Sequence, residues 1–184
     1  IDITPTQMLE YLFNKVNCNK IFIPGSTDPT SSNWPQPPIN SHFFSGVSSV
    51  ESCTNPASFD INEIEFLVCS GDSIHDVTKE TSYSFHEAQT MLLRWRLLAP
   101  SMPSLMQPQP SMMTDRLVIE DVPNYFICGD SDSFAWSTYN GVNIISVPPF
   151  WSTKTAVFID LHTGVINSRK FTRENEECRS ENVD

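Results

Sequence analysis

The chain has 184 residues, of which 39% are hydrophobic and 18% charged, a composition typical of a globular protein with a single core. No apolar run approaches the roughly 20 residues that a membrane helix needs. Twenty-two Asp and Glu against 11 Lys and Arg give a net charge of −11, which repels a phosphate backbone. The charge therefore favours a protein partner over strong direct binding of nucleic acid.

The amino-terminal third predicts one helix and one buried strand. Thr4-Pro5 precedes an apolar stripe at helical spacing between residues 8 and 16, which predicts a capped helix with proline in its first turn. Residues 20–23 form a short apolar run, and we expect a strand buried on both faces. The proline-rich residues 26–42 predict a long loop around Trp34. This loop is either a docking surface for a partner or a stiff crossover packed on its own domain.

The middle of the chain predicts a second strand and a second helix. Residues 63–69 form the strand, which ends at Ser70-Gly71 and is expected to run into a loop. Ser84 and Glu87 have the spacing of a capping box. The helix that follows carries an apolar stripe of Ala88, Met91, Leu92, Trp95 and Leu98. Arginines flank Trp95, so this segment is either a nucleic-acid patch or, as its helical spacing favours, part of the core.

The last third predicts strands and hairpins after an irregular linker at residues 100–114. Residues 125–128 form a third apolar run, which ends on a glycine. Asn140-Gly141 supplies the positive φ angles of a tight hairpin turn. We expect one β-hairpin in residues 134–147 and a second in residues 155–169. Residues 173–184 are expected to form an acidic, flexible tail.

The cysteines and histidines show no metal-ligand spacing. Without a CxxC pair among them, we expect the cysteines to be reduced core thiols of an intracellular protein. They are Cys18, Cys53, Cys69, Cys128 and Cys178. The four histidines lie beside predicted loops or on polar helix faces, and we expect them to be solvated. They are His42, His75, His86 and His162.

Three predicted strands run into glycine loops that carry hydroxyls or carboxylates. Loops outside the carboxyl ends of strands are where ligands bind in open α/β sheets. We therefore expect the three loops to share one crevice. Their side chains are Ser26 and Asp28, then Ser70 and Asp72, then Asp130 and Asp132.

Six segments, in one order along nearly the whole chain, carry a resemblance to a known family. They are PGSTDPT (24–30), TNP (54–56), FLVCSGDSIHDV (66–77), LLRWRLLAPSMP (92–103), VPNYFICGDSDSF (122–134) and ISVPPFWSTKTAVFIDLHTG (145–164). With them the chain resembles the small B subunits of eukaryotic DNA polymerase delta, which have a calcineurin-like metallophosphoesterase fold. The B subunits of polymerases alpha and epsilon have the same scaffold function but bind a different partner. The order of the segments favours delta.

The resemblance implies an α/β fold, a mixed-sheet sandwich of the calcineurin-like metallophosphoesterase type with two β-hairpins at its carboxyl end. In the family, an OB-fold domain and the first half of the phosphoesterase domain precede the helix that opens this chain. We therefore expect residues 1–172 to be the carboxyl-terminal part of that domain, completed by segments outside this sequence, and residues 173–184 to be a tail.

The resemblance also implies an inactivated fold with no catalytic residue, bound metal or cofactor. Active relatives carry Asn and His where this chain has Ser26 and Thr27. They carry a lone His where this chain has Ser70, and Gly-His-x-His where this chain has Gly-Asp-Ser-Asp at residues 129–132. A two-metal phosphoesterase holds two cations about 3.5–4 Å apart, and hydroxyl groups do this poorly. The vestigial positions are Ser26, Thr27, Asp28, Ser70, Asp130 and Asp132.

The alternative is a metal-dependent phosphodiesterase or 3′–5′ exonuclease. Its ligands would be Asp28, Asp130 and Asp132, because carboxylates bind hard cations, and segments outside this sequence would have to supply the remaining carboxylates and histidines. Turn chemistry is the more ordinary role of exposed aspartates beside glycines.

By resemblance, the protein is a non-catalytic accessory subunit that acts in the nucleus, in DNA replication and repair. It would link the metal-binding carboxyl-terminal domain of the polymerase catalytic subunit to a third, elongated non-catalytic subunit. The resemblance implies the catalytic subunit of a translesion polymerase as a further partner. Such a scaffold raises the effective concentration of the subunits that it links and fixes their relative orientation.

Overall fold

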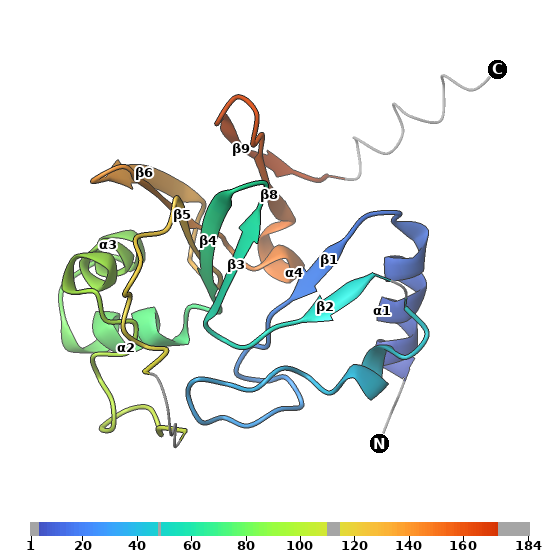
Figure 1. The fold of residues 1–184 in the computed structure, drawn as a ribbon, viewed down its shortest axis with the longest axis horizontal. Helices are drawn as coiled ribbons and strands as arrows, with labels where there is room; N and C mark the ends of the chain where they lie inside the picture. The colour runs from blue at the N-terminus through green and yellow to red at the C-terminus, as the bar shows by residue number, and fades with distance from the viewer. Residues whose placement is uncertain (1–3, 48, 110–114, 173–184) are drawn as a thin grey trace.

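A five-stranded mixed sheet organises the computed structural model, which describes residues 4–47, 49–109 and 115–172 (Figure 1). The central strands β4, β5 and β7 are parallel, and the edge strands β3 and β6 run antiparallel to their neighbours. The expected mixed α/β class with a mixed sheet is confirmed. In sheet order the strands are β3 (Ala57–Ile61), β4 (Ile64–Cys69), β5 (Tyr125–Cys128), β7 (Val142–Ser146) and β6 (Ala135–Tyr139).

Helices α2 (Asp72–Glu80) and α3 (Phe85–Trp95) cover one face of this sheet (Figure 1). The core between helices and sheet includes fully buried side chains from all three, among them Ile74, Leu92 and Phe126. The prediction of a loop after Ser70-Gly71 is wrong, because α2 begins there. Gly71 is the N-cap of α2 and provides no side-chain hydrogen bond, so the usual sequence signal of a helix start is missing.

Gln89 fixes the orientation of α3 on the sheet. Its buried Nε2 donates to the carbonyl oxygens of Phe126 (3.0 Å) and Ile145 (3.1 Å), and its Oε1 accepts from Ser146 Oγ (2.7 Å). Because Gln89 is held against the sheet, the face of α3 that carries Gln89 is the buried one, rather than the face centred on Trp95. Trp95 is consequently 45% exposed, and the expectation that it belongs to the core is wrong.

The predicted capping box begins α3. The carboxylate of Glu87 accepts from the backbone N–H of Ser84 (2.8 Å), and Ser84 Oγ accepts from the backbone N–H of Glu87 (3.4 Å). Hydrogen bonds from Ser84 hold the pKa of Glu87 below its ordinary value of 4.5. A carboxyl with a lowered pKa stabilises the fold above its ordinary pKa and loses that contribution as the pH falls through the folded value.

We expect Ser84→Ala to destabilise the protein by about 1 kcal/mol in urea unfolding at neutral pH, because the cap is lost. The exposed Ser82 lies outside the capping box, and Ser82→Ala is expected to change stability by less than about 0.5 kcal/mol. The difference in unfolding free energy between Ser84→Ala and Ser82→Ala should become smaller below pH 4.5, because Glu87 is then protonated. Equal losses in both variants at neutral pH would contradict the role of the cap.

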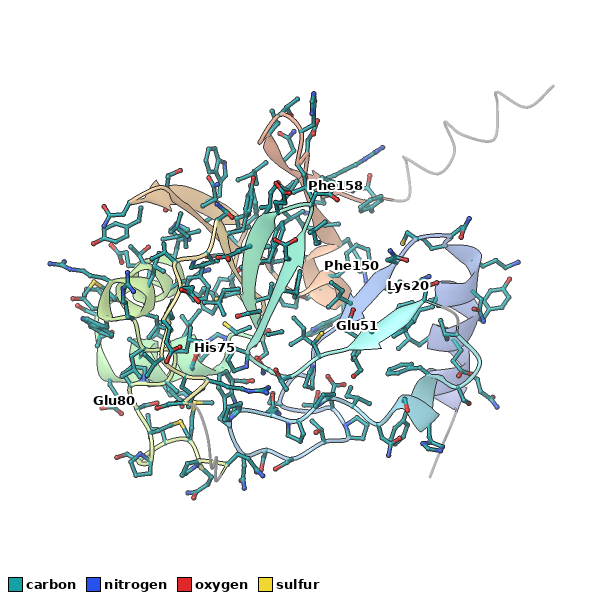
Figure 2. The ribbon with its side chains drawn as sticks, in the orientation of Figure 1. Lys20, Glu51, His75, Glu80, Phe150 and Phe158 are labelled. Carbon is teal, nitrogen blue, oxygen red and sulfur yellow. The ribbon has the colours of Figure 1, made fainter. Side chains whose placement is uncertain are left out.

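The hairpin of β8 (Thr155–Ile159) and β9 (Ile166–Lys170) covers the opposite face of the sheet. Phe66, Tyr125 and Ile166 are buried in this second core. The turn between β6 and β7 has positive φ at Asn140 (48°) and Gly141 (83°), as its sequence predicts. The short helix α4 (Phe150–Thr153) leads into β8, and Figure 2 shows Phe150 and Phe158 on this part of the molecule.

A smaller layer is formed by α1 (Thr4–Lys15), β1 (Lys20–Phe22), the 3₁₀ helix η1 (Ser41–Phe44) and β2 (Val50–Ser52) (Figure 1). Helix α1 is confirmed. Rings of Phe13, Phe22 and Phe44 hold the layer together. The prediction of a strand buried on both faces is wrong, since Ile21 is 38% exposed. The reason is that, among the residues described, β1 pairs with β2 alone, in a two-stranded parallel sheet apart from the main one.

The proline-rich loop packs on its own domain. Trp34 is 2% exposed, and its backbone N–H and carbonyl bond with Gln107 (2.9 Å) and Gln109 (2.6 Å). Of the two expectations for this loop, the stiff crossover is confirmed. The structure contains no helix, within the residues it describes, that has the length and apolar character to span a bilayer. The predicted tail lies outside the described residues.

Two of the cysteines lie inside the sheet and one lies on the surface. Cys69 and Cys128 are paired neighbours on β4 and β5, both buried, with their Sγ atoms 3.0 Å apart. Burial, followed by contact with Cys69, raises the pKa of Cys128 well above 9.0. Cys18 is exposed and Cys53 partly buried, so the expectation of core thiols is wrong for Cys18; Cys178 is outside the described residues.

We expect iodoacetamide in mildly alkaline buffer to alkylate Cys18 in the native protein and to leave Cys69 and Cys128 unmodified. Only exposed thiolate reacts, and both burial and the raised pKa of Cys128 suppress it. After unfolding in guanidinium, all three should be alkylated, as mass spectrometry of peptides will show. Native-state modification of Cys128 as fast as that of Cys18 would contradict this picture.

Candidate functional site

Two of the three predicted loops meet where β4 and β5 end side by side. Cys69 and Cys128 are in register, and the backbone N–H of Gly129 donates to the carbonyl of Cys69 (3.0 Å). Gly71 has φ 107°, and a Cβ there would collide with the carbonyl oxygen of Gly129. The loops that contain Ser70 and Asp130 are therefore in direct contact through their glycines.

The third loop, after β1, reaches this edge of the sheet through two buried amides. Asn55 is fully buried: its Nδ2 donates to Gln36 Oε1 (2.6 Å) and Ser70 Oγ (2.6 Å), and its Oδ1 accepts from the Ser70 N–H (3.1 Å). Gln36, 2% exposed, donates to the carbonyls of Gly25 (3.4 Å) and Ser31 (3.1 Å). We call Gln36, Asn55 and Ser70 the amide junction. It connects loops that belong to different sheets.

In the loop after β1 and at the end of β4, three predicted site residues, Asp28, Ser70 and Asp72, form local hydrogen bonds. Asp28 Oδ2 accepts from the N–H of Gly25 (2.7 Å) and closes its own turn. Ser70 Oγ donates to Asp72 Oδ2 (2.7 Å). Ser26 and Thr27 are exposed.

In the loop after β5, Asp130 is paired with a histidine of α2. His75 Nε2 lies 3.1 Å from Asp130 Oδ2 and 2.9 Å from its carbonyl oxygen, with side-chain exposures of 36% and 59%. Figure 2 labels His75 on α2. Asp132 is exposed, and Ser131 between the two aspartates is buried.

Across the residues that the structure describes, no three His, Cys, Asp or Glu side chains gather closely enough to hold a metal ion. Asp28, Asp130 and Asp132 therefore do not converge on one metal site within the described part of the chain. The expectation of solvated histidines is wrong for His86, which is bonded to the hydroxyls of Ser146 (2.7 Å) and Ser137 (2.8 Å). Burial lowers its pKa below 6.5.

A cavity of about 500 Å³ lies beside the amide junction, but the loop after β5, which the prediction also placed in the shared crevice, does not line it. Its lining includes Ser26, Trp34, Gln36, Asp72 and His75. It thus brings residues of the loop after β1 together with residues of α2, the helix that follows β4.

Sequence reasoning missed Gln36 and Asn55 as site residues. Asn55 lies in the TNP segment, and that segment of the resemblance was the available signal for it. Gln36 stands among prolines without a recognisable pattern. In the junction, neutral amides and a hydroxyl satisfy one another, which holds the loops rigidly but supplies no charge for a divalent cation.

Comparison with known proteins identifies the family. The family model of the DNA polymerase alpha/epsilon B-subunit matches residues 4–136. The DNA polymerase delta small subunit of Arabidopsis thaliana is 35% identical over 76% of this chain and 34% of that protein. The probable DNA polymerase delta small subunit of Caenorhabditis elegans is 27% identical over 86% of this chain and 38% of that protein. The DNA polymerase II small subunit of Archaeoglobus fulgidus is 32% identical over 73% of this chain and 28% of that protein.

The chain thus spans about a third of the length of these curated relatives. A solved archaeal phosphodiesterase is 11% identical over 89% of this chain and 76% of that chain, with a TM-score of 0.47, too low to carry an argument. The family model, in contrast, covers most of the chain, from α1 into β6, and includes the amide junction and the three strand-end loops. The chain belongs to the DNA polymerase alpha/epsilon B-subunit family.

Proposed function

We propose that the chain is part of a non-catalytic small subunit of a delta-type DNA polymerase and acts as a scaffold in DNA replication and repair in the nucleus. The amide junction carries this proposal. Gln36, Asn55 and Ser70 are neutral groups that satisfy one another, and Ser70 stands where active relatives of the resembled fold carry a histidine. The names of the relatives, delta small subunits from plants to animals, support the same function.

For the domain as a whole, we propose an inactivated metallophosphoesterase-like fold of which residues 1–172 are the carboxyl-terminal part. Ser26, Thr27, Asp28, Ser70, Asp130 and Asp132 mark its former ligand positions. The order of the sequence segments supports this assignment, and so does the contact between the loops after β4 and β5.

The proposed partner is the polymerase catalytic subunit, held through its metal-binding carboxyl-terminal domain. A third non-catalytic subunit and a translesion polymerase catalytic subunit are proposed as further partners. The net charge of −11 supports a role built on protein contacts, because it opposes binding to the DNA backbone.

A phosphodiesterase assay tests the proposed loss of metal chemistry. With manganese and bis(p-nitrophenyl) phosphate or single-stranded DNA, the full chain should hydrolyse substrate no faster than Asp130→Ala/Asp132→Ala. The control Glu51→Ala/Glu80→Ala removes two exposed carboxylates on β2 and α2 (Figure 2). Manganese-dependent hydrolysis that the first double substitution abolishes and the second leaves intact would overturn the proposal.

A further inference from the structure

A groove borders the open edge of the five-stranded sheet. Strand β3 is an edge strand, with β4 on one side (Figure 1). Beside it, a cavity of about 620 Å³ lies between these strands and residues 115–123. Ser58, Phe59 and Asp60, three consecutive residues of β3, line the cavity. Ser58 and Asp60 pair with Leu67 and Glu65 of β4, which also line the cavity, so the cavity lies over the face that these four residues share, next to the edge of β3.

The groove is strongly acidic. Asp60 and Glu65 stand directly opposite each other on β3 and β4, an arrangement of like charges that costs stability. Asp115, Glu120 and Asp121 line the facing wall, and Arg116 is the single basic residue of the lining. None of the five carboxylates forms an ion pair with another residue in the described part of the chain.

Apolar side chains lie between these carboxylates. Leu67 and Leu98 are buried at the base of the groove, and Val118 in its wall is 42% exposed. A nucleic acid is repelled by five carboxylates. A peptide with both apolar and basic side chains matches apolar and acidic groups in one groove.

We infer that this groove binds an extended protein segment in which Lys or Arg alternates with apolar residues, and that the segment adds to β3 as a further strand. Backbone hydrogen bonds to the open edge supply affinity, and alternate side chains supply specificity. On the groove side, the basic groups reach Asp60 and Glu65, with their aliphatic stems along Val118. On the other side, the apolar residues extend the sheet face that Phe59 occupies. This surface goes beyond the scaffold function proposed above.

Fluorescence anisotropy with the labelled peptide Lys-Val-Lys-Val-Lys-Val-Lys and the full chain tests the docking site. Asp60→Asn/Glu65→Gln keeps the shape of both side chains and relieves their repulsion, and it should weaken binding about tenfold or more. The matched control Glu51→Gln/Glu80→Gln removes the same number of charges elsewhere on the surface (Figure 2) and should leave the Kd within about twofold.

Strand addition is tested by a fully N-methylated form of the peptide, which cannot donate backbone hydrogen bonds and should not bind. The unmethylated peptide should also slow hydrogen exchange in β3. The proposal is overturned if the wild-type chain binds no peptide, if Asp60→Asn/Glu65→Gln binds as tightly as wild type, or if methylation has no effect. Because the peptide contains no polymerase sequence, failure here is distinguishable from failure to bind a polymerase subunit.

Discussion

Gly71→Ala should destabilise the protein by about 4 kcal/mol, because two costs combine at this position. A φ of 107° is a conformation that L side chains rarely adopt, with a cost of about 1–3 kcal/mol. The added Cβ also collides with the carbonyl oxygen of Gly129, whose own N–H is bonded to Cys69. Since backbone rather than a flexible side chain blocks the Cβ, relaxation must separate the ends of β4 and β5, at a further cost of about 1–3 kcal/mol.

Gly164→Ala is the matched control, measured with Gly71→Ala by urea unfolding. Gly164 also has positive φ (72°), but apart from the glycine and its two chain neighbours no atom of the described residues lies within 4 Å of the position that a Cβ would take, so backbone strain alone should cost about 1 kcal/mol. The difference between the two variants isolates the contact between the loops. Equal destabilisation would show that the Gly71–Gly129 contact does not hold the site together.

Asn55→Ala should destabilise the protein by about 3 kcal/mol. The substitution removes the partner that Gln36 and Ser70 share, leaving the buried Gln36 Oε1 without its donor and Ser70 without two hydrogen bonds. Each buried polar group deprived of its partner costs about 1–3 kcal/mol.

The control for this variant is Asn167→Ala on β9, where the asparagine is exposed, and a change below about 0.5 kcal/mol is expected. Urea unfolding at neutral pH compares the two. A loss at Asn55 no larger than that at Asn167 would mean that the junction contributes nothing to stability.

Elements with strong local signals were predictable from the sequence. The capping box at Ser84 and Glu87 marks the start of α3, and Asn140-Gly141 marks the turn between β6 and β7. Helix α2 was missed because one glycine, Gly71, both ends the loop after β4 and caps the helix. The sheet to which β1 belongs was also unpredictable, since a short apolar run does not identify the strand that pairs with it.

The candidate site was predictable only in part, for a related reason. Parallel pairing of β4 and β5 brings the loops of Ser70 and Asp130 together, and the strand pattern indicated this. The amide junction, in contrast, joins Asn55 to Gln36 and Ser70, which are 19 and 15 residues away. Such bonds have no periodicity, and nothing local distinguishes a buried asparagine from one in a turn.

Affinity purification of the full chain under native conditions, followed by mass spectrometry, tests the scaffold function most directly. Stoichiometric recovery of a DNA polymerase catalytic subunit, unchanged by Asp130→Ala/Asp132→Ala, is the predicted result. If the protein instead elutes alone, with a manganese-dependent nuclease activity that those two substitutions abolish, the scaffold function is contradicted and the strand-end loops form a working metal site.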